Sequence, residues 1–244
     1  MTTELKPGII VRRLTKRIGR KCILEDVDFS IQPAQIAAVI GPNGSGKTTL
    51  LRILATLMRP SDGDIRVAGY PLPEEAVLAR THVGVVLHQP LLYSDLTARE
   101  NLVFHARLHN RENSDHQISQ LLQRVGLAGR EDDLVRTFSR GMQQRLAIAR
   151  AILTNPDILL LDEPFTGLDS EGIVTLTVIL KQMADRGAAI LLSSHDVPGV
   201  EMLATRFLIL NKGKMQVSIG KSELSENGLL SVYQKSFPPA GEAQ

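Results

Sequence analysis

Residues 41–49, GPNGSGKTT, restrict what this chain can fold into more than any other stretch. They match the pattern G-x-x-x-x-G-K-S/T, with the apolar run IAAVI (36–40) before them and a helix-like stretch (47–58) after them. A short continuous apolar run is typical of a strand buried on both faces, as in a parallel sheet covered by helices. A strand, a glycine-rich loop and a helix in this order predict an α/β fold with a phosphate-binding loop.

The residue types in this loop suit phosphate. Gly44 and Gly46 let backbone N–H groups turn toward phosphate oxygens, and the N-terminus of the following helix adds partial positive charge. Lys47 neutralises the β- and γ-phosphates, and Thr48 offers its hydroxyl to Mg²⁺. We expect the whole loop to bind the nucleotide: Gly41, Pro42, Asn43, Gly44, Ser45, Gly46, Lys47, Thr48 and Thr49.

A second apolar run, ILLLDEP (158–164), ends on two acids. Asp162 is placed to hold Mg²⁺, as a carboxylate at the end of such a strand does beside a phosphate loop. Glu163 follows at the lip of the sheet, where it can orient or deprotonate an attacking water. The alternative is a pair of solvated acids at a strand end. Because a phosphate loop requires such a strand elsewhere in the chain, we favour the catalytic interpretation.

Three further polar residues are weaker candidates. His195 and Gln89 each end a predicted core strand, and ligands of α/β sheets bind at that edge. We therefore expect His195 to be catalytic, and the amide of Gln89 to meet Mg²⁺ or the attacking water. Asp169 is most simply the N-cap of the helix predicted at 170–186.

The stretch TFSRGMQQRLAIARA (137–151) predicts an amphipathic helix capped by Ser139. Gly141 lies in its first turn, where glycine lowers helix stability by roughly 1 kcal/mol relative to alanine. A glycine at this position therefore needs a reason other than helix formation.

The order of strand-like and helix-like segments predicts a single unit over residues 1–220, beginning with antiparallel strands. A helical insertion interrupts it and contains a capping box formed by Thr97 and Glu100. The expected parts are the α/β core (1–89 and 141–220), the helical insertion (90–140) and a partly disordered tail (221–244).

Composition and charge indicate which partners and which compartment to expect. The net charge of +2 comes without a block of Lys and Arg, so the charge pattern does not favour nucleic acid as a partner. Cys22 is the single cysteine, which rules out a disulfide within the chain. The sequence opens without a charged-then-apolar leader, and its apolar runs are far shorter than the roughly 20 residues that span a bilayer. We therefore expect a cytosolic chain whose membrane role comes through a partner.

Together these motifs resemble the ATP-binding subunit of ABC transporters, over residues 9–220. The phosphate loop, Gln89, FSRGM (138–142), LLLDEP (159–164), TGLD (166–169) and SSH (193–195) occur in that family's order. The resemblance implies a P-loop NTPase of the ABC ATPase type, with an N-terminal antiparallel β subdomain and a helical subdomain. It also implies hydrolysis of ATP with Mg²⁺.

In that family the FSRGM segment is the signature motif, usually written L-S-G-G-Q, which binds the γ-phosphate of ATP held by the P-loop of the other subunit. The resemblance thus implies a dimer that sandwiches ATP. Ser139 would contact that phosphate, and Gly141 would let the backbone come close. In the same scheme Glu163 polarises water, His195 contacts the γ-phosphate as a switch, and Asp169 links the two sites.

The chain departs from the family pattern at two places. Ile18 stands near the position of an aromatic residue that stacks on adenine, so we expect weaker or less base-selective nucleotide binding. Phe138, Arg140 and Met142 replace Leu, Gly and Gln of the signature, whereas the two phosphate-contacting positions are unchanged.

Residues 84–109 are most similar to exporter-type cassettes, especially the ATP-binding subunit of the haem exporter used in cytochrome c maturation. This implies a peripheral subunit at the cytoplasmic face of the cell membrane, which binds a separate membrane subunit through a surface at 91–108. A multidrug or other small-molecule exporter, a soluble ABC ATPase and a P-loop kinase with a helical lid remain alternatives. The histidines of this region are expected to be surface and loop residues: His82, His88, His105, His109 and His116.

Overall fold

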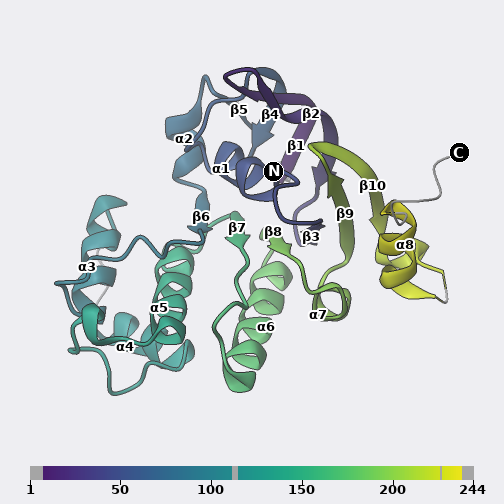
Figure 1. The fold of residues 1–244 in the computed structure, drawn as a ribbon. Helices are drawn as coiled ribbons and strands as arrows, with labels where there is room; N and C mark the ends of the chain where they lie inside the picture. Colours follow the sequence, from purple (N-terminus) through teal and green to yellow (C-terminus); the bar gives the residue numbers. More distant parts are fainter. Residues whose placement is uncertain (1–7, 112–114, 226, 238–244) are drawn as a thin grey trace, which may run out of the picture.

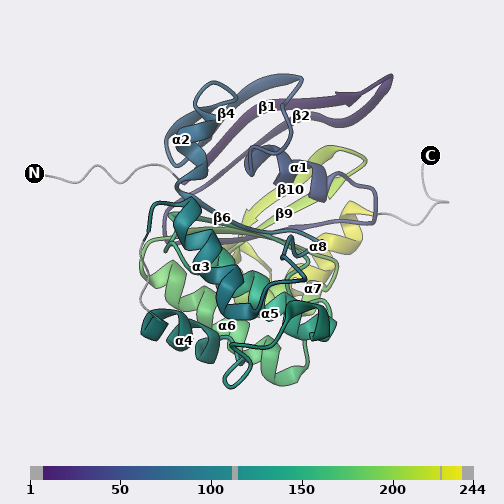
Figure 2. The same cartoon turned by 90° about the vertical axis from the view of Figure 1, so that its left-hand side faces the viewer.

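The computed structural model describes residues 8–111, 115–225 and 227–237. Two sheets lie one above the other, with helix α1 (Lys47–Leu54) between them and further helices below the larger sheet (Figures 1 and 2). The chain thus has the predicted α/β fold.

The larger sheet has six strands in the order β10-β9-β3-β8-β7-β6. β3 pairs in parallel with β8 and β9, and β7 pairs in parallel with β8 and β6, while β10 runs antiparallel beside β9. The carboxyl ends of the parallel strands therefore meet at one edge of the sheet. The strands are β3 (Ile36–Ile40), β6 (Val83–Val86), β7 (Ile158–Asp162), β8 (Ala189–Ser194), β9 (Arg206–Asn211) and β10 (Lys214–Gly220).

The smaller sheet is antiparallel, in the order β2-β1-β4-β5, and confirms the predicted N-terminal β subdomain. Side chains of β3 alternate between two hydrophobic layers. Ala37 and Val39 pack with α1 and the antiparallel sheet, while Ala38 and Ile40 face the helices on the other side. Burial on both faces explains the continuous apolar run in this strand. The strands are β1 (Ile9–Ile18), β2 (Lys21–Ile31), β4 (Asp62–Val67) and β5 (Tyr70–Leu72).

Two helices follow β6 along the chain and lie beside α5 at one side of the molecule (Figure 1). The first begins with the predicted capping box, because Thr97 Oγ1 accepts from the Glu100 N–H at 3.1 Å and Glu100 Oε2 accepts from the Thr97 N–H at 2.8 Å. The longer helices are α3 (Ala98–Leu108), α4 (Asp115–Arg124), α5 (Arg140–Ile152) and α6 (Ser170–Asp185). Among the described residues, the helices are all too short or too polar to cross a membrane.

Several elements differ from the predictions. Helix α1 ends at Leu54 rather than near residue 58, because Thr56 has a left-handed backbone with φ of 62°. The short helices α2 (Ala76–Arg80), α7 (Val197–Leu203) and α8 (Gly228–Ser236) were not predicted.

Helix α8 lies inside the tail for which we expected partial disorder. Its Leu229 side chain is fully buried, and the Leu229 N–H donates to Glu201 Oε1 of α7 at 3.1 Å. This helix depends on contacts with a distant segment, which local sequence patterns do not reveal. Residues 238–244 of the tail lie outside the described part.

The five histidines of the 82–116 region have different surroundings. His82 Nδ1 lies 2.6 Å from Asp157 Oδ2, and the rings of His105 and His109 meet at a tilt of 54° with centroids 4.6 Å apart. Burial, with His109 and Arg150 nearby, lowers the pKa of His105 from 6.5 to about 4. His105 is thus a half-buried histidine on α3 that is neutral at pH 7, whereas a surface or loop histidine was expected.

This pKa shift predicts a loss of stability in acid. Between pH 6.5 and about 4 the unfolded chain protonates His105 and the folded chain does not, so the free energy of unfolding falls as the pH drops. We expect this group to contribute a loss of roughly 1–2 kcal/mol between pH 7 and 5, measured by urea unfolding. His105→Gln should flatten that dependence, and His116→Gln on the exposed face of α4 should not. An unchanged slope in His105→Gln would contradict the assignment.

Candidate functional site

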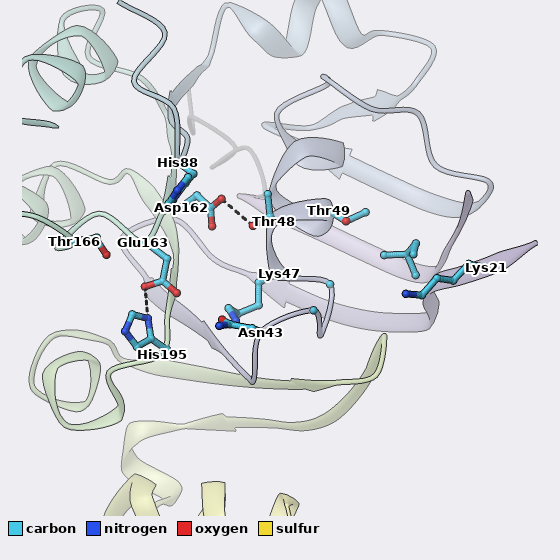
Figure 3. A pocket seen from close by; sticks show the side chains of 13 residues that line it. Lys21, Asn43, Lys47, Thr48, Thr49, His88, Asp162, Glu163, Thr166 and His195 are labelled. Carbon is cyan, nitrogen blue, oxygen red and sulfur yellow. Dashed lines mark hydrogen bonds and ion pairs between the residues drawn. The ribbon is translucent and has the colours of Figure 1, made fainter. Parts of the chain in front are cut away.

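A cavity of about 520 Å³ opens at the carboxyl edge of the larger sheet, around the phosphate loop (Figure 3). Loop residues on one side face the ends of β7 and β8 on the other. Its lining comprises Lys21, Ile23, Asn43, Gly44, Gly46, Lys47, Thr48, Thr49, His88, Asp162, Glu163, Thr166 and His195. Most of the predicted phosphate-site residues therefore come together with both predicted acids.

Lys47 lies at the base of this cavity. Its Nζ donates to the carbonyl oxygens of Gly41 at 2.7 Å and Pro42 at 3.2 Å, and the residue is 7% exposed. Burial lowers the pKa of Lys47, while the nearby carboxylates of Glu163 and Asp162 raise it. A buried ammonium group at the start of a helix is suited to an anionic ligand such as phosphate.

The phosphate loop joins α1 through a backbone conformation that favours glycine. Gly46 is the N-cap of α1 and has φ of 112°. A Cβ atom here would lie 2.7 Å from Leu24 Cδ2, so both conformation and space favour glycine. Gly41, Pro42 and Ser45 do not line the cavity; the first two supply carbonyl groups to Lys47, and Ser45 is buried.

A chain of hydrogen bonds fixes the carboxylate at the end of β7. Thr48 Oγ1 donates to Asp162 Oδ2 at 2.9 Å, and Ser193 Oγ donates to Asp162 Oδ1 at 2.6 Å. Asp162 is 3% exposed and pairs with Ser193 across β7 and β8. Ser193 was not among the predicted site residues, although the two serines at the end of the apolar strand AILLSS pointed to that edge of the sheet.

Glu163 has an unusual backbone conformation, with φ of 51°. Its N–H donates to Ser193 Oγ at 2.9 Å, and its Oε2 lies 2.9 Å from His195 Nδ1, which Figure 3 shows as a facing pair. A left-handed conformation at a non-glycine residue is unfavourable by about 1–3 kcal/mol, and it persists where surrounding contacts require it. Glu163 is thus held at the cavity with His195 as its partner.

Two predicted site residues lie elsewhere. Gln89 is exposed and does not line the cavity, because β6 ends at Val86 and the loop that follows brings His88 there instead. Ile18 is 53% exposed and also outside the lining, which Lys21 and Ile23 of β2 supply. Ile18 is paired with Lys21 at the turn end of the β1–β2 hairpin. Directly opposed residues point to the same face of a sheet, so Ile18 lies on the face that carries Lys21.

Ser139 and Gly141 lie outside the cavity, at the N-terminus of α5. Ser139 Oγ accepts from the Met142 N–H at 3.2 Å, which confirms the predicted N-cap. A Cβ atom at Gly141 would lie 2.8 Å from the carbonyl oxygen of Gly167. The structure therefore gives this glycine a packing reason within the chain, which local sequence patterns do not reveal.

Asp169 is the N-cap of α6, as predicted. Its Oδ1 accepts from the Gly172 N–H at 2.9 Å and lies 2.6 Å from Arg145 Nη2. The Gly172 N–H and Arg145 lower the pKa of the Asp169 carboxyl. Asp169 does not line the cavity in this chain.

The contact at Gly141 predicts the sign of a stability change. Gly141→Ala is expected to lower the free energy of unfolding by roughly 1–2 kcal/mol, because the added methyl group is too close to a backbone carbonyl. An unrestricted helix position would instead gain about 1 kcal/mol from the same change. Urea unfolding of Gly141→Ala beside exposed Arg140→Ala measures this, and a stabilised Gly141→Ala would rule out the packing reason.

The fold and this cavity define a phosphate-loop protein built to hydrolyse nucleoside triphosphate. Residues 24–166 match the ABC transporter family, and the chain belongs to that family. It is an ATP-binding subunit of an ABC transporter and an ATPase.

Several proteins similar to this chain are named for resistance or export, and others are uncharacterized ABC transporter ATP-binding proteins. The linearmycin resistance ATP-binding protein LnrL of Bacillus subtilis is 32% identical over 209 residues, which cover 85% of this chain and 67% of that protein. The Nod factor export ATP-binding protein I of Cupriavidus metallidurans is 35% identical over 213 residues, which cover 86% of this chain and 70% of that protein.

Solved structures agree with the fold assignment. An ATP-binding subunit of an ABC transporter superposes with a TM-score of 0.87 and 29% identity, covering 95% of this chain and all of that one. The ATP-binding cassette MJ0796, in a dimeric post-hydrolysis state bound to ADP and Pi, gives a TM-score of 0.80 and 26% identity, covering 87% of this chain and 98% of that one.

Proposed function

We propose that this chain powers an exporter of small molecules, as a dimer attached to a separate membrane subunit at the cytoplasmic face of the cell membrane. The main support is that similar proteins are named for linearmycin resistance and Nod factor export, and that the chain has a cavity at its phosphate loop lined by Lys47, Asp162 and Glu163. A multidrug-type exporter fits these relatives better than haem export, which neither of the two relatives above is named for.

In the proposed site, Lys47 and the loop N–H groups bind the β- and γ-phosphates of ATP. Thr48 and Asp162, already 2.9 Å apart, supply the oxygen ligands that Mg²⁺ prefers, and the ion would neutralise phosphate charge when bound. Glu163 orients and deprotonates the attacking water, and His195 positions the Glu163 carboxylate and contacts the γ-phosphate. Asn43, Gly44 and Thr49 complete the cradle.

The dimer proposal rests on the position of α5. Ser139 and Gly141 lie at the start of this helix and outside the cavity of their own chain, and in the proposed dimer a second copy brings them to ATP. A helix N-terminus carries partial positive charge and free N–H groups, which suit a γ-phosphate. The dimeric state of the MJ0796 cassette is consistent with this arrangement.

We place the membrane subunit on the helical subdomain, at a surface formed by Leu91, Tyr93, Phe104 and Leu108. All four are exposed: 56%, 53%, 38% and 65%. Tyr93 and Phe104 stack edge to face with centroids 5.0 Å apart. Buried Asn101 holds the Tyr93 backbone, accepting from its N–H at 2.9 Å and donating to its carbonyl at 3.0 Å. This preformed apolar surface suits a short helix of the partner.

The experiment is co-expression with the candidate membrane subunit, followed by reconstitution in vesicles. We expect amphipathic drugs to raise the ATPase rate and to be transported when ATP is present. We expect Leu108→Asp to abolish co-purification with the membrane subunit and to leave the ATPase rate of the free subunit unchanged. If haem rather than drugs stimulates the ATPase rate, the cargo is haem. An ATPase that never co-purifies with a membrane protein would favour the soluble ABC ATPase alternative.

A further inference from the structure

Helix α5 contacts the loop that carries Glu163 at three points. Gln144 Nε2 donates to the Pro164 carbonyl at 3.0 Å in a buried contact. Gly141 lies against the Gly167 carbonyl, and Arg145 pairs with Asp169. One face of the first two turns of α5 therefore contacts the segment that follows Glu163 at Pro164, Gly167 and Asp169.

The Gln144 contact is next to Glu163 along the chain. Glu163 is held on its amino side, where its N–H donates to Ser193 Oγ at 2.9 Å. On its carboxyl side the following residue is a proline, and the Pro164 carbonyl oxygen is held by Gln144. These two bonds bracket the residue whose φ of 51° is otherwise unfavourable.

Burial makes the second bond hard to replace. Gln144 is 7% exposed, so its amide and the Pro164 carbonyl have little access to water. Removing the donor leaves a buried acceptor unpaired and releases the left-handed backbone toward a more common conformation. Since the carboxylate of Glu163 follows its backbone, such a release moves it relative to the cavity.

We propose that Gln144 is a positioning residue for Glu163, and that it sets the position of the carboxylate through the Pro164 carbonyl. The proposal rests on the role of Glu163 given under Proposed function. In that scheme α5 of one copy presents Ser139 to the ATP bound by the other copy, while Glu163 acts on the ATP of its own chain. Gln144 therefore connects a helix that contacts one ATP with the catalytic base that acts on the other.

The test compares Gln144→Met with Gln143→Met in steady-state ATPase assays. Methionine keeps the length of glutamine without a donor, and Gln143 donates to a different carbonyl, that of Phe138 at 3.3 Å. We expect Gln144→Met to lower kcat roughly 10- to 100-fold with KM for ATP within about 2-fold. Gln143→Met should keep both within about 2-fold. A wild-type kcat in folded Gln144→Met would overturn the proposal.

A double variant separates this proposal from the role of Glu163. If Gln144 acts through Glu163, Gln144→Met changes the residual rate of Glu163→Gln by less than about 2-fold. The same loss in both backgrounds would overturn it. Wild-type activity in Glu163→Gln alone would refute the role of Glu163 instead.

Gln144→Glu keeps the test valid if Gln144→Met fails to fold. An ionised carboxylate cannot donate to Pro164, whereas a protonated one can. We expect the kcat of Gln144→Glu, relative to wild type, to rise as the pH is lowered. A ratio that does not change with pH would contradict a hydrogen-bonding role.

Discussion

Glu163→Gln is expected to lower kcat for ATP hydrolysis at least about 100-fold while ATP still binds, because the amide cannot accept the proton of the attacking water. The substitution keeps the size of the side chain and its capacity to bond to His195, which lies 2.9 Å away. With hydrolysis blocked, ATP and Mg²⁺ should hold two copies together. Size-exclusion chromatography would then show a dimer that wild type forms only transiently.

The matched control for this experiment is Glu171→Gln, an exposed glutamate in the first turn of α6. It should leave kcat within about 2-fold of wild type, since surface substitutions of this kind rarely matter. A Glu163→Gln chain that remains monomeric with ATP and Mg²⁺ would argue against the sandwich dimer. A wild-type rate would argue against Glu163 as the base.

Lys47→Ala is expected to weaken ATP binding at least about 100-fold, or about 2.7 kcal/mol. The substitution removes the buried ammonium group and its hydrogen bonds to the carbonyls of Gly41 and Pro42, of which the Pro42 carbonyl still accepts from the Ser45 N–H at 3.2 Å. It also leaves the carboxylates of Asp162 and Glu163 without a compensating charge, and these would then repel phosphate.

Calorimetric titration with ATP measures the dissociation constant for Lys47→Ala and for Lys181→Ala, an exposed lysine on α6. The control should match wild type. Equal affinity in all three proteins would mean that the phosphate loop is not where ATP binds. Thermal unfolding of the same samples shows whether Lys47→Ala is folded.

Local patterns predicted the elements whose stability is local. The capping box at Thr97 and Glu100 and the N-caps at Ser139 and Asp169 depend on residues three apart in sequence. The buried strands were predicted because a strand covered on both faces has to be apolar at every position. The short helix α8 was not predicted, because its stability comes from contacts with α7.

The candidate site was predictable where a motif specifies spacing, and not where two segments have to meet. Gln89 does not line the cavity in this structure, because the length of β6 and the course of the next loop decide which side chain reaches it. Ser193 was missed because its role depends on pairing with Asp162 in the next strand. Gln144 was missed for the same reason, since Pro164 is distant in sequence and near only in the fold.

The amino-acid sequence by itself determined that this chain has a phosphate loop, an acidic strand end and a capped helix at Ser139. These features follow from short-range spacing and from the apolar content of each strand. Only the tertiary structure decided why Gly141 is a glycine and what holds Glu163. A helix glycine is unfavourable locally, but the approach of the Gly167 carbonyl leaves no room for a methyl group. The Gly167 carbonyl comes close to Gly141 only when α5 packs against the loop after β7. These two segments are far apart in sequence, so no local pattern can predict the contact.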